Sequence, residues 1–204
     1  MSTQIIACLD HSEFGQSVLA AGIWAAKTLA APLVLKHVLE KPQQANADFS
    51  GAIGLGAQDV LLAELAQLDQ QRSKIQLAQG RMLLATAKTT ALQQGVLQIS
   101  ESLRHDDLTD SLLEDEASNR LVILGKRGAS HAAAHGFLGL NVERVLRSAQ
   151  KPVLIVQPQF KQPDNFLLAF DGSATMLKNL QTISQSPLLK GLPCHLVMVA
   201  KANA

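Results

Sequence analysis

The sequence has no tyrosine, one tryptophan and only two cysteines. A chain that is 3% aromatic has few rings that can stack on unpaired bases, so a surface for single-stranded nucleic acid is not expected. Two cysteines cannot build the disulfide framework of a small secreted domain. Because Cys8 and Cys194 both lie in apolar runs, we expect buried free thiols in a protein of the reducing cytoplasm.

An excess of one charge is also missing, because 18 Lys and Arg against 17 Asp and Glu give a formal net charge of +1. Neither nucleic acid nor a membrane surface is therefore an expected partner. No apolar run reaches the length of about 18 residues that predicts a membrane-spanning helix. A strand-like run begins almost at the first residue, so we expect no signal peptide.

Short apolar runs alternate with helix-forming segments. The expected strands are 4–9, 32–39, 96–101, 121–124 and 152–156. The expected helices are 13–29, 59–94 with a possible break near Gly80, 106–117 and 139–150. Runs of this kind are typical of strands buried on both faces of a parallel sheet. The alternation predicts an α/β fold, Rossmann-like, with an open five-stranded parallel sheet and helices on both faces.

Polar residues next to these segments predict helix ends. Ser12 is expected to cap the first helix, and Asp106 or Asp107 is expected to cap the third. The acidic run 114–118 is interpreted as a solvated helix end. The long helix 59–94 is expected to pack in the core, with a partner-helix contact possible if it outgrows the sheet.

The opening of the chain is repeated 161 residues later. "IIACLDHS" at 5–12 corresponds to "FLLAFDGS" at 166–173, so that Asp10 falls on Asp171. We therefore predict a complete domain over 1–158, a linker over 159–164 and an incomplete second β-α-β copy over 165–204. Because a lone β-α-β unit exposes much apolar surface, we expect this copy to pack on the first, pair with another chain or be partly disordered.

The densest chemical signal is the connection that follows the fourth expected strand. Gly125, Gly128 and Gly139 lie along it, and Lys126 and Arg127 add positive charge. Glycine lets a ligand approach the backbone closely, and a helix N-terminus presents unpaired N–H groups that suit phosphate. Ligands of open α/β sheets bind at the carboxyl ends of the strands. The segment therefore predicts an anion cradle, although the glycines also suit a tight strand-to-helix connection.

These motifs resemble the universal stress protein family in its tandem two-domain form. The family pattern of Gly, two residues, Gly, a longer gap and Gly is matched by the three glycines, and its Pro-Val-Leu-Val strand is matched by "KPVLIV". The opening "DHSE" resembles the family's Asp-Gly-Ser-Glu. The resemblance covers 3–157, with 165–204 as a partial second copy, and implies the strand order 3-2-1-4-5.

The resemblance also implies a ligand. In members that bind ATP, adenosine lies near the positions of Asp10 and Val38. The phosphates lie over the three glycines and the two residues after the last of them, with Arg127 at the mouth. The residues implied to bind nucleotide are thus Asp10, Val38, Gly125, Arg127, Gly128, Gly139, Leu140 and Asn141. This sequence departs from the pattern at Leu140, where the family usually has a hydroxyl residue, and in its gap of ten residues between the second and third glycines.

Three functions remain open at this point. The first is a cytoplasmic, non-catalytic binding module for ATP or another adenine nucleotide in stress adaptation. The second is a dimerisation or scaffold protein of the same fold that has lost its ligand, and the third is a slow ATP hydrolase. We favour the first and expect no enzyme, because no base or metal cluster is evident; His131 and His135 lack a third ligand and are interpreted as exposed or pocket-rim residues. We also expect a homodimer through the fifth strand, which is an apolar sheet edge.

Overall fold

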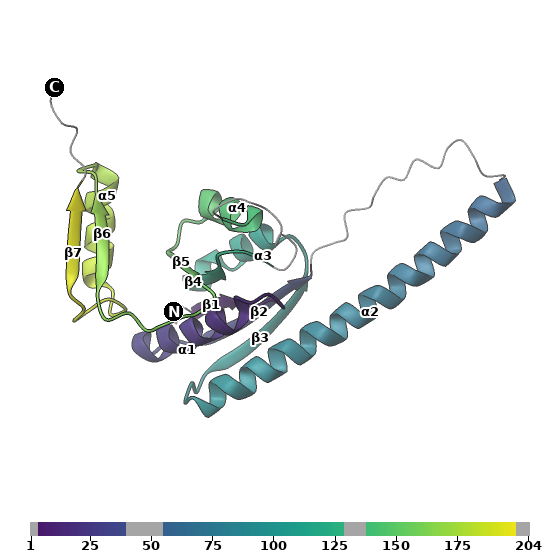
Figure 1. Ribbon diagram of the computed structural model, residues 1–204, viewed down its shortest axis with the longest axis horizontal. Helices are drawn as coiled ribbons and strands as arrows, with labels where there is room; N and C mark the ends of the chain where they lie inside the picture. Colours follow the sequence, from purple (N-terminus) through teal and green to yellow (C-terminus); the bar gives the residue numbers. More distant parts are fainter. Residues whose placement is uncertain (1–3, 40–54, 129–137, 199–204) are drawn as a thin grey trace, which may run out of the picture.

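The computed structural model describes residues 4–39, 55–128 and 138–198 (Figure 1). In chain order the first part contains β1 Gln4–Cys8, α1 Gly15–Leu29, β2 Leu33–Leu39, α2 Leu55–Gln93, β3 Ile99–His105, α3 Leu108–Glu114, the 3₁₀ helix η1 Glu116–Ser118, β4 Asn119–Gly125, α4 Leu140–Ser148 and β5 Val153–Val156. The second part contains β6 Phe166–Phe170, α5 Ala174–Gln185 and β7 Cys194–Met198.

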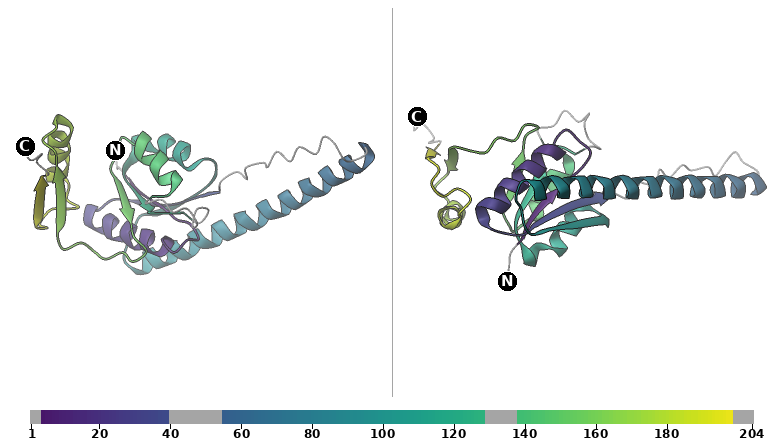
Figure 2. Two further views of the ribbon diagram at one scale, coloured as in Figure 1. Left: turned by 45° about the horizontal axis from the view of Figure 1, so that its top comes forward. Right: turned by 90° about the horizontal axis from the view of Figure 1, so that it is seen from below.

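Strands β1 to β5 form one parallel sheet with the order β3-β2-β1-β4-β5. Helices α1 and α2 cover one face and α3 and α4 cover the other (Figure 2). Both the predicted α/β class and the strand order 3-2-1-4-5 are confirmed. The third strand differs most from its expected range, because it begins at Ile99 and runs on to His105.

The central strand β1 divides the core into two apolar clusters. Ile5 and Ala7 point to the face that α1 and α2 cover, where they meet Leu33 of β2. Ile6 points to the opposite face and packs with Val34 and side chains of α3 and α4. Because both faces of β1 are sealed, Ile5, Ile6 and Ala7 have no exposed surface, and continuous apolar sequence in this strand follows from that position.

Helix α2 is the long helix that the sequence predicts, and the break near Gly80 that the sequence left open does not occur. A Cβ atom at this position would lie 2.9 Å from Cδ2 of His37 and 2.9 Å from Cδ1 of Leu103. Gly80 therefore marks the place where α2 crosses closest to β2 and β3. The absence of a side chain permits this close approach, and the helix continues because its backbone hydrogen bonds are not affected.

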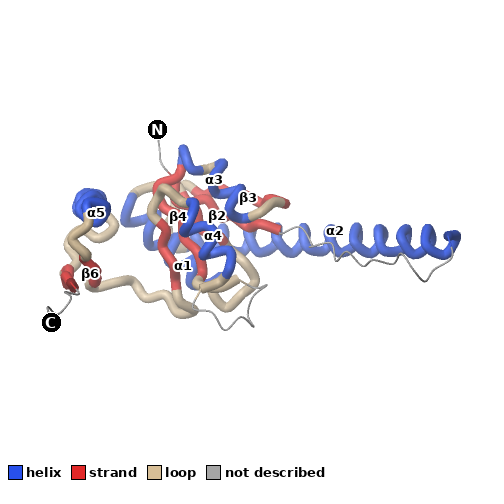
Figure 3. The backbone as a smooth tube through the Cα atoms, turned by 90° about the horizontal axis from the view of Figure 1, so that it is seen from above, coloured by secondary structure: helices blue, strands red, loops and turns tan. Residues whose placement is uncertain are grey.

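Only the C-terminal third of α2 packs on the sheet. Its buried residues within the described range are Gly80, Leu84, Ala87 and Ala91. Between 62 and 79 every described residue is exposed or half-buried, and this part projects beyond the sheet (Figures 1 and 3). At about 1.5 Å per residue the whole helix is about 58 Å long. Helix α2 therefore outgrows its sheet, which the sequence had left open.

The second part of the chain repeats the first β-α-β arrangement. Strands β6 and β7 pair in parallel, from Phe166 opposite Cys194 to Phe170 opposite Met198. Every residue of β7 is exposed, so Cys194 is an exposed thiol and not the buried one that the sequence predicted. The domain limits 1–158 and 165–204 remain a prediction, since two strands by themselves do not define a second domain.

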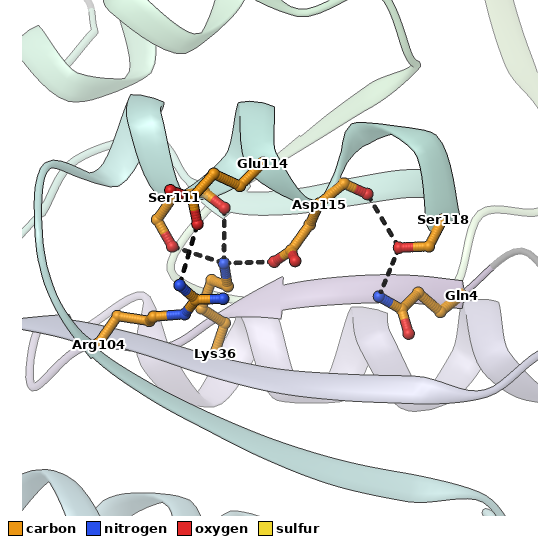
Figure 4. A network of polar contacts seen from close by, with 7 residues as sticks. All are labelled: Gln4, Lys36, Arg104, Ser111, Glu114, Asp115 and Ser118. Carbon is orange, nitrogen blue, oxygen red and sulfur yellow. Dashed lines mark hydrogen bonds and ion pairs between the residues drawn. The ribbon is translucent and has the colours of Figure 1, made fainter.

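A buried lysine joins the sheet to α3, and the sequence reading missed it. Lys36 of β2 has no exposed surface. Its Nζ donates hydrogen bonds to the carbonyl oxygen of Ser111 at 2.9 Å and to the Ser111 hydroxyl at 2.6 Å, and forms an ion pair with Asp115 (Figure 4). The acidic run 114–118 is therefore only partly a solvated helix end: Asp115 turns inward to neutralise Lys36.

Replacing Asp115 with Asn should destabilise the fold much more than replacing its neighbour Glu114 with Gln. The first change leaves the Lys36 charge buried without a counter-ion, which costs about 3 kcal/mol of unfolding free energy. Glu114 pairs with Arg104 at the surface, where both side chains are about half exposed, and such pairs contribute less than about 1 kcal/mol. Urea denaturation of both variants measures the difference, and equal losses would contradict this account.

Candidate functional site

Four of the predicted site residues converge at the carboxyl ends of β1 and β4. A Cβ atom at Gly128 would lie 3.3 Å from Oδ2 of Asp10. A Cβ atom at Gly139 would lie 3.3 Å from Cα of Arg127 and 3.7 Å from the nitrogen of Gly128. The two ends of the connection therefore meet beside one carboxylate, which lies at the edge of the sheet where α/β folds bind ligands.

The Asp10 carboxylate is fixed by the residues that follow it. The backbone N–H of Ser12 donates to Oδ1 of Asp10 at 3.0 Å, and the Ser12 hydroxyl donates to the same oxygen. The N–H of Phe14 donates to the Ser12 hydroxyl at 3.2 Å. Helix α1 itself begins at Gly15 without a side-chain cap. The prediction that Ser12 caps this helix is thus wrong, because its hydroxyl orders the turn that holds Asp10.

Gly125 has a different role from the other two glycines. A Cβ atom there would lie 2.6 Å from Cβ of Phe14, closer than real side chains approach. The bare backbone lets the end of β4 pack against the buried Phe14 ring, which is 5% exposed. Gly125 therefore brings the start of α1 against the end of β4, whereas Gly128 borders the Asp10 carboxylate and Gly139 lies against the backbone of Arg127 and Gly128.

Helix α4 begins at this point with its backbone uncapped by a side chain. Gly139 precedes the helix and supplies no side-chain hydrogen bond, and its own N–H donates to the carbonyl oxygen of Lys126 at 3.0 Å. One of the amides expected to face an anion is therefore used internally. The next amides belong to the first turn, where an α-helix has no acceptors of its own. Leu140, at the first helical position, is 46% exposed and does not fill a buried space.

Val38 lies near the carboxyl end of β2, one strand away from Asp10. It is half-buried and paired with Arg104 of β3. Strand alternation places Val38 on the same face as Lys36, the face that α3 and α4 cover. The predicted residues thus spread over the ends of β2, β1 and β4, and Asn141 lies in the first turn of α4.

His37 is a second residue of this region that sequence reasoning missed. Its Nδ1–H donates to the carbonyl oxygen of Leu9 at 2.7 Å, and the N–H of Leu9 donates to the carbonyl oxygen of Lys36 at 2.8 Å. These bonds fix the backbone directly before Asp10. The ring of His11 packs edge-on against His37 with centroids 5.7 Å apart. The sequence around His37 gives no signal for these contacts, because they depend on Leu9 and His11, which lie 28 and 26 residues earlier in the chain and follow the neighbouring strand β1.

Burial lowers the pKa of His37, because the apolar surroundings disfavour the imidazolium, and the nearby His11 acts in the same direction. The folded protein therefore binds fewer protons at His37 than the unfolded chain does. Stability that this histidine contributes is present above the unfolded pKa near 6.5 and is lost as the pH falls through that value towards the folded pKa.

Replacing His37 with Gln should make the unfolding free energy depend less on pH between pH 7 and pH 5. The wild-type unfolding free energy should fall over this range, and the fall should be smaller in the variant, which has no proton to bind there. Urea denaturation at pH 7, 6 and 5 measures both slopes. As a control, replacing the exposed His195 with Gln should leave the slope unchanged. Equal slopes for the His37 variant and the wild type would contradict the assignment.

The described side chains near Asp10 can bind a polar ligand. Burial raises the pKa of the Cys8 thiol to about 12, so Cys8 is protonated at neutral pH. Within the described ranges no group of three or more His, Cys, Asp or Glu side chains is placed to hold a metal ion; His131 and His135 lie outside these ranges. A fixed carboxylate, a helix N-terminus and an arginine together offer acceptors and donors to a polar, anionic ligand.

The fold defines a doubly wound α/β protein whose candidate site lies at the carboxyl ends of β1 and β4. The universal stress protein family model matches residues 1–157, and the chain belongs to this family. It is 36% identical over 202 residues to universal stress protein Slr1230 of Synechocystis, covering 98% of this chain and 70% of the relative. The family predicted from the motifs is therefore confirmed.

Solved structures agree with the fold. A universal stress protein from Archaeoglobus fulgidus DSM 4304 is 16% identical with a TM-score of 0.59, covering 99% of this chain and 69% of that one. A universal stress protein solved in complex with cAMP is 19% identical with a TM-score of 0.51, covering 78% of this chain and 98% of that one. Among the described residues, no helix combines the length and apolarity that crossing a bilayer requires.

Proposed function

We propose that this universal stress protein is a cytoplasmic, non-catalytic module that binds an adenine nucleotide, ATP or AMP, in stress adaptation. The observation that carries the proposal is the meeting of Gly128, Gly139 and Asp10 at the edge of the sheet where α4 begins. Asp10 and Val38 would hold the adenosine, since a fixed carboxylate accepts hydrogen bonds from ribose hydroxyls. The solved complex of a family member with cAMP supports the ligand class.

The phosphates would lie at the N-terminus of α4. The helix dipole favours negative charge there, beside Leu140 and Asn141, and Gly128 leaves room for close approach. Arg127, half-buried beside Gly139, would balance the charge. Gly125 would support this site through its contact with Phe14.

The competing function is a scaffold of the same fold without a ligand. Two observations favour it: Leu140 brings no hydroxyl to the phosphate position, and the Gly139 amide already donates to Lys126. Nucleotide identified by mass spectrometry in the purified protein would separate the two functions. Protein that carries no nucleotide and binds none when titrated would support the scaffold.

Replacing Leu140 with Ser should tighten ATP binding by about 10-fold, because a hydroxyl donor to a charged phosphate is worth about 1.5 kcal/mol. Replacing Gly139 with Val should weaken binding by at least about 10-fold, because a side chain there would crowd the backbone of Arg127. Isothermal titration calorimetry measures both affinities, and circular dichroism checks that each variant is folded.

The matched control is Leu97→Ser, since Leu97 is 90% exposed and lies before β3, outside the predicted set of residues. It should leave the affinity unchanged. Unaltered affinity in both the Leu140 and the Gly139 variants would remove the phosphate site from the proposal.

We further propose that the chain is of the tandem type, with β6, α5 and β7 belonging to a second universal-stress unit. Three observations support this: the repeated motif, the equivalent parallel pairing of β6 with β7, and the match of 98% of the chain to 70% of a longer relative. Ser173 caps α5 by accepting from the N–H of Met176 at 3.1 Å. Asp171 accepts from the N–H of Ser173, just as Asp10 accepts from Ser12.

We also propose that two chains pair through β5. In the part of the chain that the structure describes, β5 is hydrogen-bonded only to β4, so one of its edges is open. Val153, Leu154 and Ile155 are half-buried, which is the exposure typical of a strand that a partner completes.

Replacing Ile155 with Glu should weaken this association by at least about 10-fold, because a charge in an apolar strand pair must be desolvated. Sedimentation velocity at micromolar concentration measures the change. The control Lys151→Glu alters charge at an exposed position just before the strand. A wild-type protein that is strictly monomeric, or a variant that associates as the wild type does, would contradict pairing through β5.

A further inference from the structure

Helix α2 carries apolar side chains on the face turned away from its own sheet, two of them in the projecting part and one just after Gly80. Leu68, Ile75 and Met82 follow one another at intervals of seven residues and are 60%, 58% and 71% exposed. Ser73 and Gly80 lie on the sheet side. Because two residues turn an α-helix by about 200°, Ile75 and Met82 lie nearly opposite Ser73 and Gly80.

This projecting part has no packing of its own within the described chain. No residue from 62 to 79 is buried, and the positions that would extend the sheet-facing side, Ala66 and Ser73, are small. Helices in water owe most of their stability to packing of an apolar face, and contiguous exposed apolar residues mark interaction surfaces. The outward stripe of Leu68, Ile75 and Met82 therefore needs a partner.

The charges beside the stripe indicate what that partner is. Glu64 lies four residues before Leu68 and Arg72 lies four residues after it, and both are exposed. If a second copy of α2 runs antiparallel with the twofold axis at Leu68, Glu64 of each copy lies opposite Arg72 of the other. Such an isologous contact requires that a surface be complementary to itself, and opposite charges placed symmetrically about an apolar residue meet this requirement.

The apolar positions obey the same symmetry. In this register Leu68 meets its counterpart in the second copy, so the apolar centre lies on the twofold axis. A parallel pairing would instead place Glu64 beside Glu64 and Arg72 beside Arg72, which is repulsive. The pattern of charges thus favours a second copy of α2 as the partner, and it favours the antiparallel over the parallel direction.

We propose that α2 is a self-association surface at which two copies of this chain pack their projecting helices antiparallel about Leu68. Two Glu64–Arg72 ion pairs flank the apolar centre. This contact is independent of the nucleotide site and lies on a different element from the β5 edge, so the two contacts can be tested separately.

A series of charge exchanges tests the proposal. Each variant is made both in the wild type and in the Ile155→Glu background. The second background removes any pairing through β5, so that association through α2 is measured alone. Glu64→Arg alone and Arg72→Glu alone each place like charges opposite one another at both ends of the contact. Each should raise the dissociation constant about 10-fold in 50 mM salt, where such pairs are weakly screened. The double exchange restores opposite charges and should return the constant to within about 3-fold of its parent, as measured by sedimentation equilibrium.

Substitution at the centre gives a second test. Leu68→Asp should abolish the contact, and Leu97→Asp, at a more exposed leucine outside α2, should not affect it. In a Cys194→Ser background, Leu68→Cys should form a dimer with a short bis-maleimide, whereas Gln70→Cys, on another side of the helix, should not. Failure of the double exchange to recover association, unchanged association in both single exchanges, or a monomer throughout would overturn the proposal.

Discussion

The structure depends on the burial of β1 on both faces. A strand without exposed surface at Ile5, Ile6 and Ala7 requires a helical layer above and below it, and parallel strands on either side. Each parallel strand leads towards its helix from the carboxyl end of the sheet, so the polar residues that follow β1 and β4 lie close together at that end. The positions of Asp10 and Gly128 are thus a consequence of how the core is sealed, before any ligand is considered.

Sealing the core leaves polar groups inside, and two of them on β2 have defined partners. Lys36 is neutralised by Asp115 across the α3 face, and His37 donates to the backbone of Leu9 across the α2 face. Successive residues of β2 therefore join it to different neighbours, Lys36 to α3 and His37 to the segment that follows β1. The first contact uses a charge and so fixes α3 in place, while the second stays neutral and orders the turn leading to Asp10.

The sequence predicts the architecture well because strand burial and helix periodicity are local patterns. It also predicts that Asp106 or Asp107 caps α3, and the structure has Asp107, whose carboxylate accepts from the N–H of Thr109. It does not predict the partners of Lys36 and His37, which are 75 and 28 residues away, or the reason for Gly80. A glycine that permits a close crossing and one that ends a helix look alike until the neighbouring strand is known. For the same reason the glycine motif does not reveal that Gly125 belongs to the packing of Phe14.

The attachment of α2 near Gly80 has a mechanical consequence. The helix packs against β2 at Gly80, next to His37, and no residue from 62 to 79 is buried. The span from Gly80 to position 62 is about 27 Å at 1.5 Å per residue. A tilt of about 5° where the helix crosses β2 would therefore move position 62 by about 2 Å on this geometry, so a small change beneath the candidate site would become a larger displacement at the projecting end.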